Sequence, residues 1–273
     1  MTLSTKNLFD ISEEIIIVTG VSGQLGYQYA RFLLENGSKV FGLDLFDNRK
    51  ITDLMKSYRK QFIFLKSDIT KKDELLSVSK KMIDTFGYPT VLINNAGIDT
   101  PPPKEKKDFD GNFENFPEEE WDKVLEVNLK GTYLCSQVFG SLMSKKNKGS
   151  IINISSIYGV VSPNQKVYDY LKKEGKTFFK PISYSVSKSG IINFTKYLST
   201  YWAKKNVRVN TLTIAGVYNY QDPEFVKAYT DLIPIGRMAN KDEYCGAILF
   251  LASKASSYMT GSNLVVDGGW TSI

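Results

Sequence analysis

A tyrosine and a lysine four residues apart are the best candidates for acid–base chemistry in this sequence. Tyr184 and Lys188 lie in the run Ser-Tyr-Ser-Val-Ser-Lys-Ser-Gly, and on a helix they occupy one face, one turn apart. A cationic lysine beside a phenol favours the phenolate, so such a tyrosine can pass a proton near neutral pH. Because the chain contains no histidine, its acid–base chemistry has to come from Tyr, Lys, Asp or Glu.

The same spacing recurs at Tyr168/Lys172 and at Tyr201/Lys205, so spacing alone does not single out one pair. Small residues around Tyr184 allow a ligand or another backbone to approach closely; they are Ser183, Ser185, Ser187, Ser189 and Gly190. The chain after Lys188 can also continue as a helix to about residue 206 without a proline. We therefore expect Tyr184 to be the residue that transfers the proton.

A glycine-rich turn near the N-terminus predicts a dinucleotide site. It joins an apolar run to a helical one and reads Thr19-Gly20-Val21-Ser22-Gly23-Gln24-Leu25-Gly26. Glycines there let the backbone approach a pyrophosphate, and the helix N-terminus adds N–H donors. Asp44 ends the next apolar run, where a carboxylate can accept from both ribose hydroxyls and repels a 2′-phosphate. With Leu45 following it, this favours NAD, although Arg49 and Lys50 leave NADP open.

These residues must be positioned by alternating strands and helices. Apolar runs predict strands at Ile15–Thr19, Lys39–Leu43, Phe62–Leu65, Val91–Asn94, Ser150–Ile154, Arg208–Thr211 and Leu264–Val266. Helical patterns fall near 24–36, 72–86, 118–145, 186–205 and 241–253. The alternation indicates an α/β fold, a doubly wound parallel sheet of about seven strands with helices on both faces, formed by a single domain over residues 1–273.

Two irregular segments interrupt this alternation, at 98–117 and 157–182. Both follow predicted strands, where an open parallel sheet places its ligand crevice, so we expect insertions that form substrate walls or lids. The second is expected to contain a short helix at 164–174. Whether the two segments close over a ligand stays open.

Composition argues for an ordinary globular protein. The net charge of +6 comes from lysines interleaved with acids, so we expect no nucleic-acid partner. Cys135 and Cys245 lie far apart in apolar runs without metal-type spacing, which predicts reduced core residues and no metal site. No signal peptide or membrane-spanning run is present, so we expect a cytoplasmic protein without membrane association.

From about residue 14 onward the chain resembles the compact branch of the short-chain dehydrogenase/reductases, enzymes with a Rossmann-type fold. Besides the glycine turn and the Tyr184/Lys188 pair, the matching motifs are Asn94-Asn95-Ala96-Gly97, Asn128 within Val-Asn-Leu-Lys-Gly, Ser155-Ser156, and the closing segment Thr260-Gly-Ser-Asn-Leu-Val-Val-Asp-Gly-Gly. The resemblance implies an NAD(P)-dependent oxidoreductase that transfers a hydride between nicotinamide and an alcohol or ketone.

The resemblance also implies roles for single residues. Ser156 would polarise the substrate oxygen, Tyr184 would be the general acid and base, and Lys188 would hold the nicotinamide ribose and lower the pKa of the tyrosine. Asn128 would anchor a water that relays protons. Cofactor contacts are expected from Gly20, Ser22, Gly23, Gln24, Leu25, Gly26, Asp44, Leu45, Asp68, Ile69, Asn95, Ala96, Gly97, Tyr184, Lys188, Gly216 and Val217.

The chain departs from the family pattern at two places. Gln24 stands where the compact branch usually has glycine, a spacing closer to the sugar-nucleotide-modifying branch, so an epimerase or dehydratase stays an alternative. Ala215-Gly216 replaces the expected Pro-Gly, and the threonine that often follows is missing.

Polar groups in the loops favour a small hydroxylated, sugar-like substrate. The segment 216–225 offers Asn219 and Gln221 together with tyrosines, and the second insertion carries Lys166, Lys172, Lys173 and Lys176. These groups also resemble those of oxidoreductases in bacterial surface-sugar or flagellin-glycan pathways. A 3-oxoacyl thioester reductase and a non-catalytic dinucleotide sensor remain alternatives. The resemblance further implies a homotetramer or dimer through the helices at 118–145 and 186–205.

Overall fold

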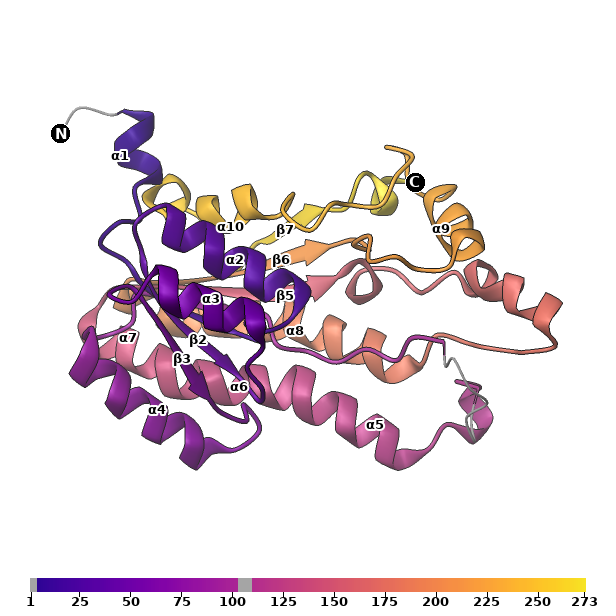
Figure 1. Cartoon of the computed structure of the whole chain (residues 1–273), viewed down its shortest axis with the longest axis horizontal. Helices are drawn as coiled ribbons and strands as arrows, with labels where there is room; N and C mark the ends of the chain where they lie inside the picture. The colour runs from indigo at the N-terminus through magenta and orange to yellow at the C-terminus, as the bar shows by residue number, and fades with distance from the viewer. Residues whose placement is uncertain (1–3, 103–109) are drawn as a thin grey trace.

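One sheet of seven parallel strands organises the chain, in the order β3-β2-β1-β4-β5-β6-β7 (Figure 1). The structure is a computed structural model and describes residues 4–102 and 110–273. The strands are β1 (Ile15–Thr19), β2 (Lys39–Asp44), β3 (Phe62–Lys66), β4 (Val91–Asn94), β5 (Gly149–Ser156), β6 (Val207–Ile214) and β7 (Asn263–Val266). The predicted Rossmann-type α/β fold is confirmed, and each predicted strand is present with ends shifted by at most three residues.

Helices cover both faces of this sheet. The α-helices are α1 (Thr5–Phe9), α2 (Gln24–Glu35), α3 (Arg49–Ser57), α4 (Lys72–Thr85), α5 (Glu118–Leu125), α6 (Thr132–Cys135), α7 (Ser141–Lys146), α8 (Ile182–Trp202), α9 (Pro223–Thr230) and α10 (Cys245–Ala252). Short 3-10 segments are η1 (Phe113–Asn115), η4 (Ile157–Gly159), η5 (Gln165–Glu174), η6 (Ala203–Lys205), η7 (Lys254–Ser256) and η8 (Trp270–Ser272). Two π-helical segments, η2 (Glu126–Gly131) and η3 (Ser136–Gly140), join α5, α6 and α7 into one run.

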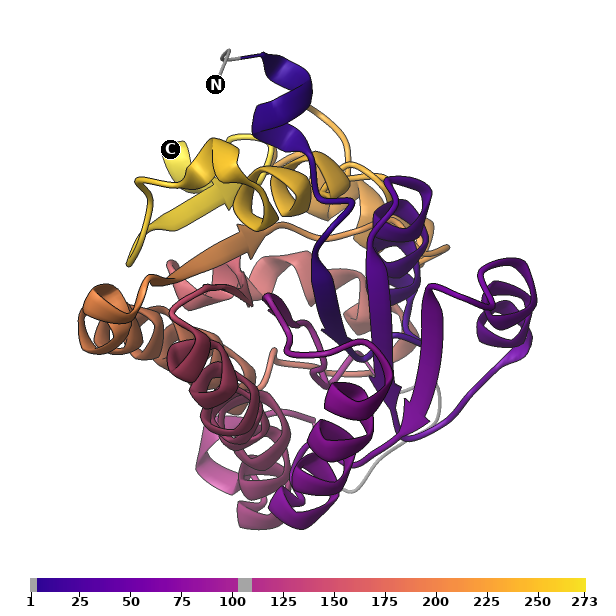
Figure 2. The same cartoon turned by 90° about the vertical axis from the view of Figure 1, so that its left-hand side faces the viewer.

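Alternate residues of the strands pack into two separate hydrophobic cores, one on each face of the sheet. Ile16 and Val18 of β1 pack with α2, α3 and α10, whereas Ile17 packs with α4, the α5–α7 run and α8. Strands buried on both faces read as continuous apolar runs, which explains the sequence Ile-Ile-Ile-Val of β1. Figure 2 shows the two helix layers on opposite sides of the sheet.

Three helices are additional to those predicted: α1, α3 and α9. In α3 only Ile51 and Leu54 are buried, so its apolar stripe is too short to stand out in the sequence. The start of α9 did carry a signal, because Asp222 caps the helix and Pro223 occupies its first turn.

The two irregular segments lie beyond the carboxyl ends of β4 and β5. Residues 103–109 of the first fall outside the described part of the chain. The short helix expected at 164–174 is present as η5, a 3-10 helix. Its residues Val167, Tyr168 and Leu171 pack with Phe178 and with Phe225 of α9 in a small apolar cluster. This cluster holds the second segment against the loop after β6.

Candidate active site

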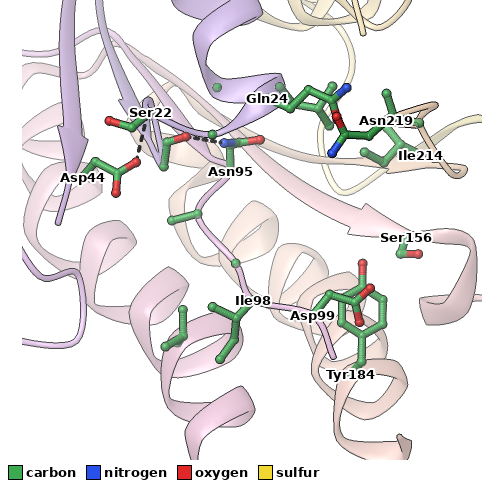
Figure 3. Close-up of a pocket in the computed structure, with 18 of the residues that line it drawn as sticks. Ser22, Gln24, Asp44, Asn95, Ile98, Asp99, Ser156, Tyr184, Ile214 and Asn219 are labelled. Carbon is green, nitrogen blue, oxygen red and sulfur yellow. Dashed lines mark hydrogen bonds between the residues drawn. The ribbon is translucent and has the colours of Figure 1, made fainter. Parts of the chain in front are cut away.

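A large cavity opens at the carboxyl ends of β1, β2, β4, β5 and β6 (Figure 3). Its volume is about 990 Å³, and its wall extends from the glycine turn to Tyr184. The strand order reverses between β1 and β4. At such a point the loops after the two parallel strands run in opposite directions and leave a crevice between them. The fold therefore brings the predicted cofactor and acid–base residues to one edge of the sheet.

Close backbone packing shapes the glycine turn into a cradle. Gly20 has a φ of +67°, and a Cβ added to Gly26 would lie 2.1 Å from the Gly20 carbonyl oxygen. Asn95 Nδ2 donates to the Thr19 carbonyl at 2.9 Å and so ties the turn to the end of β4. Only glycine fits at position 26, since any side chain would push the start of α2 away from β1.

Asp44 closes the other side of this cradle. Its Oδ2 accepts from the Ser22 N–H at 2.9 Å, and its Oδ1 accepts from the Leu45 N–H at 2.7 Å. Asp68 and Ile69, after β3, form the adjoining wall. Lys50, one of the two cations that left NADP open, has its ammonium 5.5 Å from the centre of the Tyr27 ring on α2. The carboxylate is therefore the charged group held directly at the end of β2.

Gln24 has a contact that explains its departure from the family pattern. It is the first residue of α2, and its Nε2 donates to the Tyr218 carbonyl at 3.0 Å. Gln24 thus joins the glycine turn to the loop after β6, as Figure 3 shows where Gln24 approaches Asn219. Gly216 and Val217 of that loop line the cavity, although the Pro-Gly and threonine of the family are absent.

Tyr184 and Ser156 share the opposite end of the cavity. Burial is the main cause that raises the pKa of Tyr184, and the negative charge of Asp99 adds to it, while a hydrogen bond with Ser156 lowers it. Ser156 Oγ also accepts from the Tyr158 N–H at 3.2 Å. The phenol therefore keeps its proton in the chain alone.

Lys188 lies behind Tyr184 rather than on the cavity wall. Its side chain is buried, and its Nζ donates to the Ile154 carbonyl at 3.0 Å and lies 5.8 Å from the centre of the Tyr184 ring. Burial lowers the pKa of Lys188 to about 8, although the charge of Asp99 opposes the change.

Asn128 is also buried behind the wall, in the π-helical segment η2. Its Oδ1 accepts from the Ile98 N–H at 2.8 Å, and its Nδ2 donates to the Ile98 carbonyl at 3.0 Å and to Ser187 Oγ at 3.1 Å. The amide side chain is thus occupied in holding the loop after β4.

Most predicted site residues line this one cavity. The cavity is lined by Gly20, Ser22, Gly23, Gln24, Leu25, Gly26, Asp44, Leu45, Asp68, Ile69, Asn95, Ala96, Gly97, Ser156, Tyr184, Gly216 and Val217. Asn128 and Lys188 do not line it. A Cβ on Gly97 would nevertheless lie 3.2 Å from Asn128 Oδ1 and 3.5 Å from Lys188 Nζ, so both approach the wall from behind.

An ion pair between Asp99 and Lys180 is part of the wall and was not predicted. The two residues are far apart in sequence and lie in segments without regular periodicity, so no sequence pattern connected them.

The lysines expected to face the substrate lie outside the cavity. Lys172 and Lys176 pair with acidic neighbours on the surface, Lys173 pairs with Glu224, and neither these nor Lys166 line the cavity.

The residues present fit a dinucleotide. The cradle around Gly20 and Gly26 would receive the pyrophosphate, Asp44 a ribose, and Asp68 with Ile69 the adenine. Among residues 4–102 and 110–273, no group of acidic or cysteine side chains could hold a metal ion. No helix in the same described ranges is long and apolar enough to span a bilayer.

Comparison with known proteins identifies the family of the chain. The family described as short chain dehydrogenase matches residues 14–221, and a second, described as enoyl-(acyl carrier protein) reductase, matches residues 175–271. The NAD-dependent glycerol dehydrogenase of Listeria innocua is 30% identical over 272 residues, covering 96% of each chain.

Two crystal structures are similar over nearly their whole length. A short-chain dehydrogenase from Leptospira borgpetersenii with bound NAD+ has a TM-score of 0.82 and 32% identity, covering 99% of this chain and 97% of its own. A gluconate 5-dehydrogenase from Burkholderia cenocepacia in complex with NADP and tartrate has a TM-score of 0.84 and 25% identity, covering 99% and 100%. The chain therefore belongs to the short-chain dehydrogenase family, as an NAD(P)-dependent oxidoreductase.

Proposed function

We propose that this enzyme prefers NAD and interconverts a small polyhydroxylated alcohol and its ketone, with Tyr184 as the acid and base. The observation that carries the proposal is that Tyr184 and Ser156 share one cavity with the glycine cradle and Asp44. The bound dinucleotide supplies the hydride acceptor or donor. The protein has to bind the alcohol or ketone, orient its oxygen and move one proton.

Ser156 and Tyr184 divide that task. Ser156 Oγ accepts from the Tyr158 N–H, and its one hydroxyl hydrogen, which bonds Tyr184 in the chain alone, can turn to donate to a substrate oxygen. Tyr184 retains its proton in the chain alone, which suits donation to the oxygen of a ketone. In the opposite direction the phenolate takes the proton of the alcohol. Lys188 would support that form from behind the ring.

The substrate class is inferred from the wall and from the relatives. Asn219 and Gln221 line the cavity beside the ring of Phe225, so polar groups alternate with apolar surface as a small polyol requires. Gln221 is held in place because its Nε2 donates to the Val217 carbonyl at 2.8 Å. The glycerol and gluconate dehydrogenases among the relatives support a polar substrate over an acyl thioester.

The test is the variant Tyr184→Phe with a panel of polyols, sugars, sugar phosphates and acyl thioesters and both dinucleotides. Loss of the hydroxyl should lower kcat by about 1000-fold or more while changing the Kd for NADH by less than about threefold. Tyr201→Phe is the matched control, since Tyr201 has the same spacing to a lysine but is 66% exposed. Turnover retained by Tyr184→Phe and lost by Tyr168→Phe would assign the proton to Tyr168, which also lines the cavity.

We also propose that the enzyme assembles with copies of itself through the α5–α7 run and α8. A shallow groove between them is lined by Leu125 of α5, Leu129 of η2, Tyr133 of α6 and Phe194 of α8. Tyr133 is 45% exposed and Tyr197 is 64% exposed on the same side of the molecule. Exposed aromatic side chains around an apolar groove are the composition of an interface core.

A further inference from the structure

The ion pair of Asp99 and Lys180 stands at the substrate end of the cavity, next to the reacting residue. Lys180 Nζ donates to Asp99 Oδ1 at 2.5 Å and to Oδ2 at 2.6 Å. The same ammonium lies 4.9 Å from the centre of the Tyr184 ring, and Figure 3 shows Asp99 beside Tyr184 below Ser156. A substrate whose oxygen reaches Tyr184 and Ser156 must therefore place its neighbouring carbon atoms near this pair.

The two partners face the cavity unequally. The side chain of Lys180 is 5% exposed, whereas that of Asp99 is 46% exposed. Two of the three N–H donors of the ammonium are taken by Asp99, and the Tyr184 ring lies within cation–π reach. Lys180 therefore has little capacity left for a substrate anion, and the group presented to a ligand is a carboxylate.

The carboxylate keeps one acceptor position available. Oδ1 accepts from Lys180 and from the Thr100 N–H at 2.8 Å, while Oδ2 accepts from Lys180 alone among the described residues. An ionised carboxylate has about four acceptor positions, two on each oxygen. The open position on Oδ2 can accept from a hydroxyl, which is a donor, and repels an anion.

The pair is held in place by the backbone around it. The Lys180 N–H donates to Gln165 Oε1 at 2.8 Å, and Gln165 belongs to η5. The preceding residue is fixed too, because the Phe179 N–H donates to the Asp110 carbonyl at 2.8 Å. Both contacts join the second irregular segment to its surroundings, so the segment serves to fix a buried cation under Asp99.

We propose that Asp99, held by Lys180, selects neutral polyhydroxylated substrates by accepting a hydrogen bond from a hydroxyl near the reacting carbon, and rejects the corresponding acids. Asp99 is the specificity-determining residue and Lys180 is a positioning residue. The inference rests on the proposed function and narrows its substrate class. It aligns this enzyme with the glycerol dehydrogenase rather than with the gluconate dehydrogenase among its relatives.

The experiment compares matched neutral and acidic substrates: glycerol with glycerate, and sorbitol with gluconate. In whichever pair the wild-type enzyme turns over, its kcat/KM should be about tenfold or more higher for the neutral substrate than for the acid. Asp99→Asn removes the charge and should narrow this preference by about fivefold or more, chiefly through better use of the acid. Asp99→Ala should raise the KM for the neutral member by about tenfold with a smaller change in kcat.

Two further variants separate specificity from folding. Asp99→Asn leaves the buried ammonium of Lys180 without its partner, which should lower the Tm. The double variant Asp99→Asn/Lys180→Gln has no charge at the pair and should therefore have a higher Tm than Asp99→Asn. It should show the same narrowed preference for neutral substrates. Lys173→Gln breaks an exposed pair outside the cavity and should leave the preference unchanged.

The outcomes are distinguishable. A wild-type preference for the acids would mean that Lys180 exchanges Asp99 for a substrate carboxylate, and it overturns the inference while the proposed function stands. A preference that is the same in all Asp99 variants also overturns it. Absence of turnover with every alcohol and ketone would overturn the proposed function and the inference with it.

Discussion

Asn128 and Ile98 exchange two hydrogen bonds, from the Ile98 N–H to Asn128 Oδ1 and from Asn128 Nδ2 to the Ile98 carbonyl. The Asn128 amide therefore satisfies the backbone N–H and the carbonyl of Ile98, as a neighbouring strand would. It fixes the loop after β4 that carries Gly97 and Asp99. This loop lines the cavity that contains both the glycine turn and Tyr184. Its position depends on one amide in the π-helical segment η2.

Replacement of Asn128 by Ala should therefore affect stability as well as turnover. Both backbone groups of Ile98 would lose their partner, which should lower the free energy of unfolding by about 1–2 kcal/mol. Turnover should fall and the KM for substrate should rise, because the loop is free to shift. Ser187→Ala, which removes only one of the three bonds of the amide, is the control and should cost less in a urea titration. An Asn128→Ala enzyme with full stability and reduced kcat alone would assign the residue to proton relay.

Asp44 should determine the choice of dinucleotide. With Asp44→Ser the ratio of Kd for NADPH to Kd for NADH should fall by about tenfold or more, because the charge that repels a 2′-phosphate is gone. Fluorescence titration with both reduced dinucleotides measures this without any substrate. Asp47→Ser is the control, since Asp47 lines the same cavity from the exposed loop after β2. A wild-type preference for NADPH would show that Arg49 outweighs the carboxylate.

Gly26 and Gly23 should respond differently to the same substitution. A Cβ at Gly26 meets the Gly20 carbonyl oxygen at 2.1 Å, whereas one at Gly23 lies 3.3 Å from that atom. Gly26→Ala should therefore lower the free energy of unfolding by about 1–3 kcal/mol and weaken NADH binding, because α2 must move off β1. Gly23→Ala should keep the stability nearly unchanged. Equal unfolding midpoints for the two variants would contradict this account of the cradle.

A charge placed in the groove between the α5–α7 run and α8 should reduce the assembly. Light scattering should give the wild-type enzyme the mass of a dimer or tetramer, and Tyr133→Glu should shift it toward the monomer. The control is Tyr258→Glu, at a fully exposed residue that does not line the groove. A monomeric wild-type enzyme would reject the proposed assembly.

The sequence was most informative where local chemistry and periodicity agree. The seven strands could be predicted because each is an apolar run bounded by turn residues. Most of the cavity lining could be predicted because its residues follow strand ends. Asp99 and Lys180 could not, since only the tertiary fold brings their segments together. The position of Lys188 was also beyond prediction, because helical spacing fixes its face but not whether its ammonium reaches the cavity or the Ile154 carbonyl.

The burial of Lys188 should give the protein a distinct dependence of stability on pH. Its pKa of about 8 in the folded chain lies below the ordinary 10.5, so between these values the unfolded chain binds a proton that the folded chain does not. The contribution of Lys188 to stability should therefore become more favourable as pH increases through this window, and below pH 8 the full cost of burying the charge is present. The rise contributed by this one group is about 3 kcal/mol if the whole window is crossed.

Urea unfolding at pH 7 to 9.5, without dinucleotide, measures the effect. Burial also raises the pKa values of Cys135 and Cys245, and these two thiols lower stability as pH rises through the same range, so the contribution of Lys188 is the difference between the wild-type chain and Lys188→Met. The range stays below the pH at which the buried tyrosines, whose pKa values are also raised, begin to lower stability. Lys188→Met should be more stable than the wild-type chain at pH 7, because an apolar side chain replaces a buried charge, and this advantage should shrink as pH increases to 9.5. Lys205→Met, at the exposed end of the following 3-10 turn, should show the wild-type dependence on pH. If the difference between Lys188→Met and the wild-type chain stayed constant with pH, the ammonium would have to be exposed in solution.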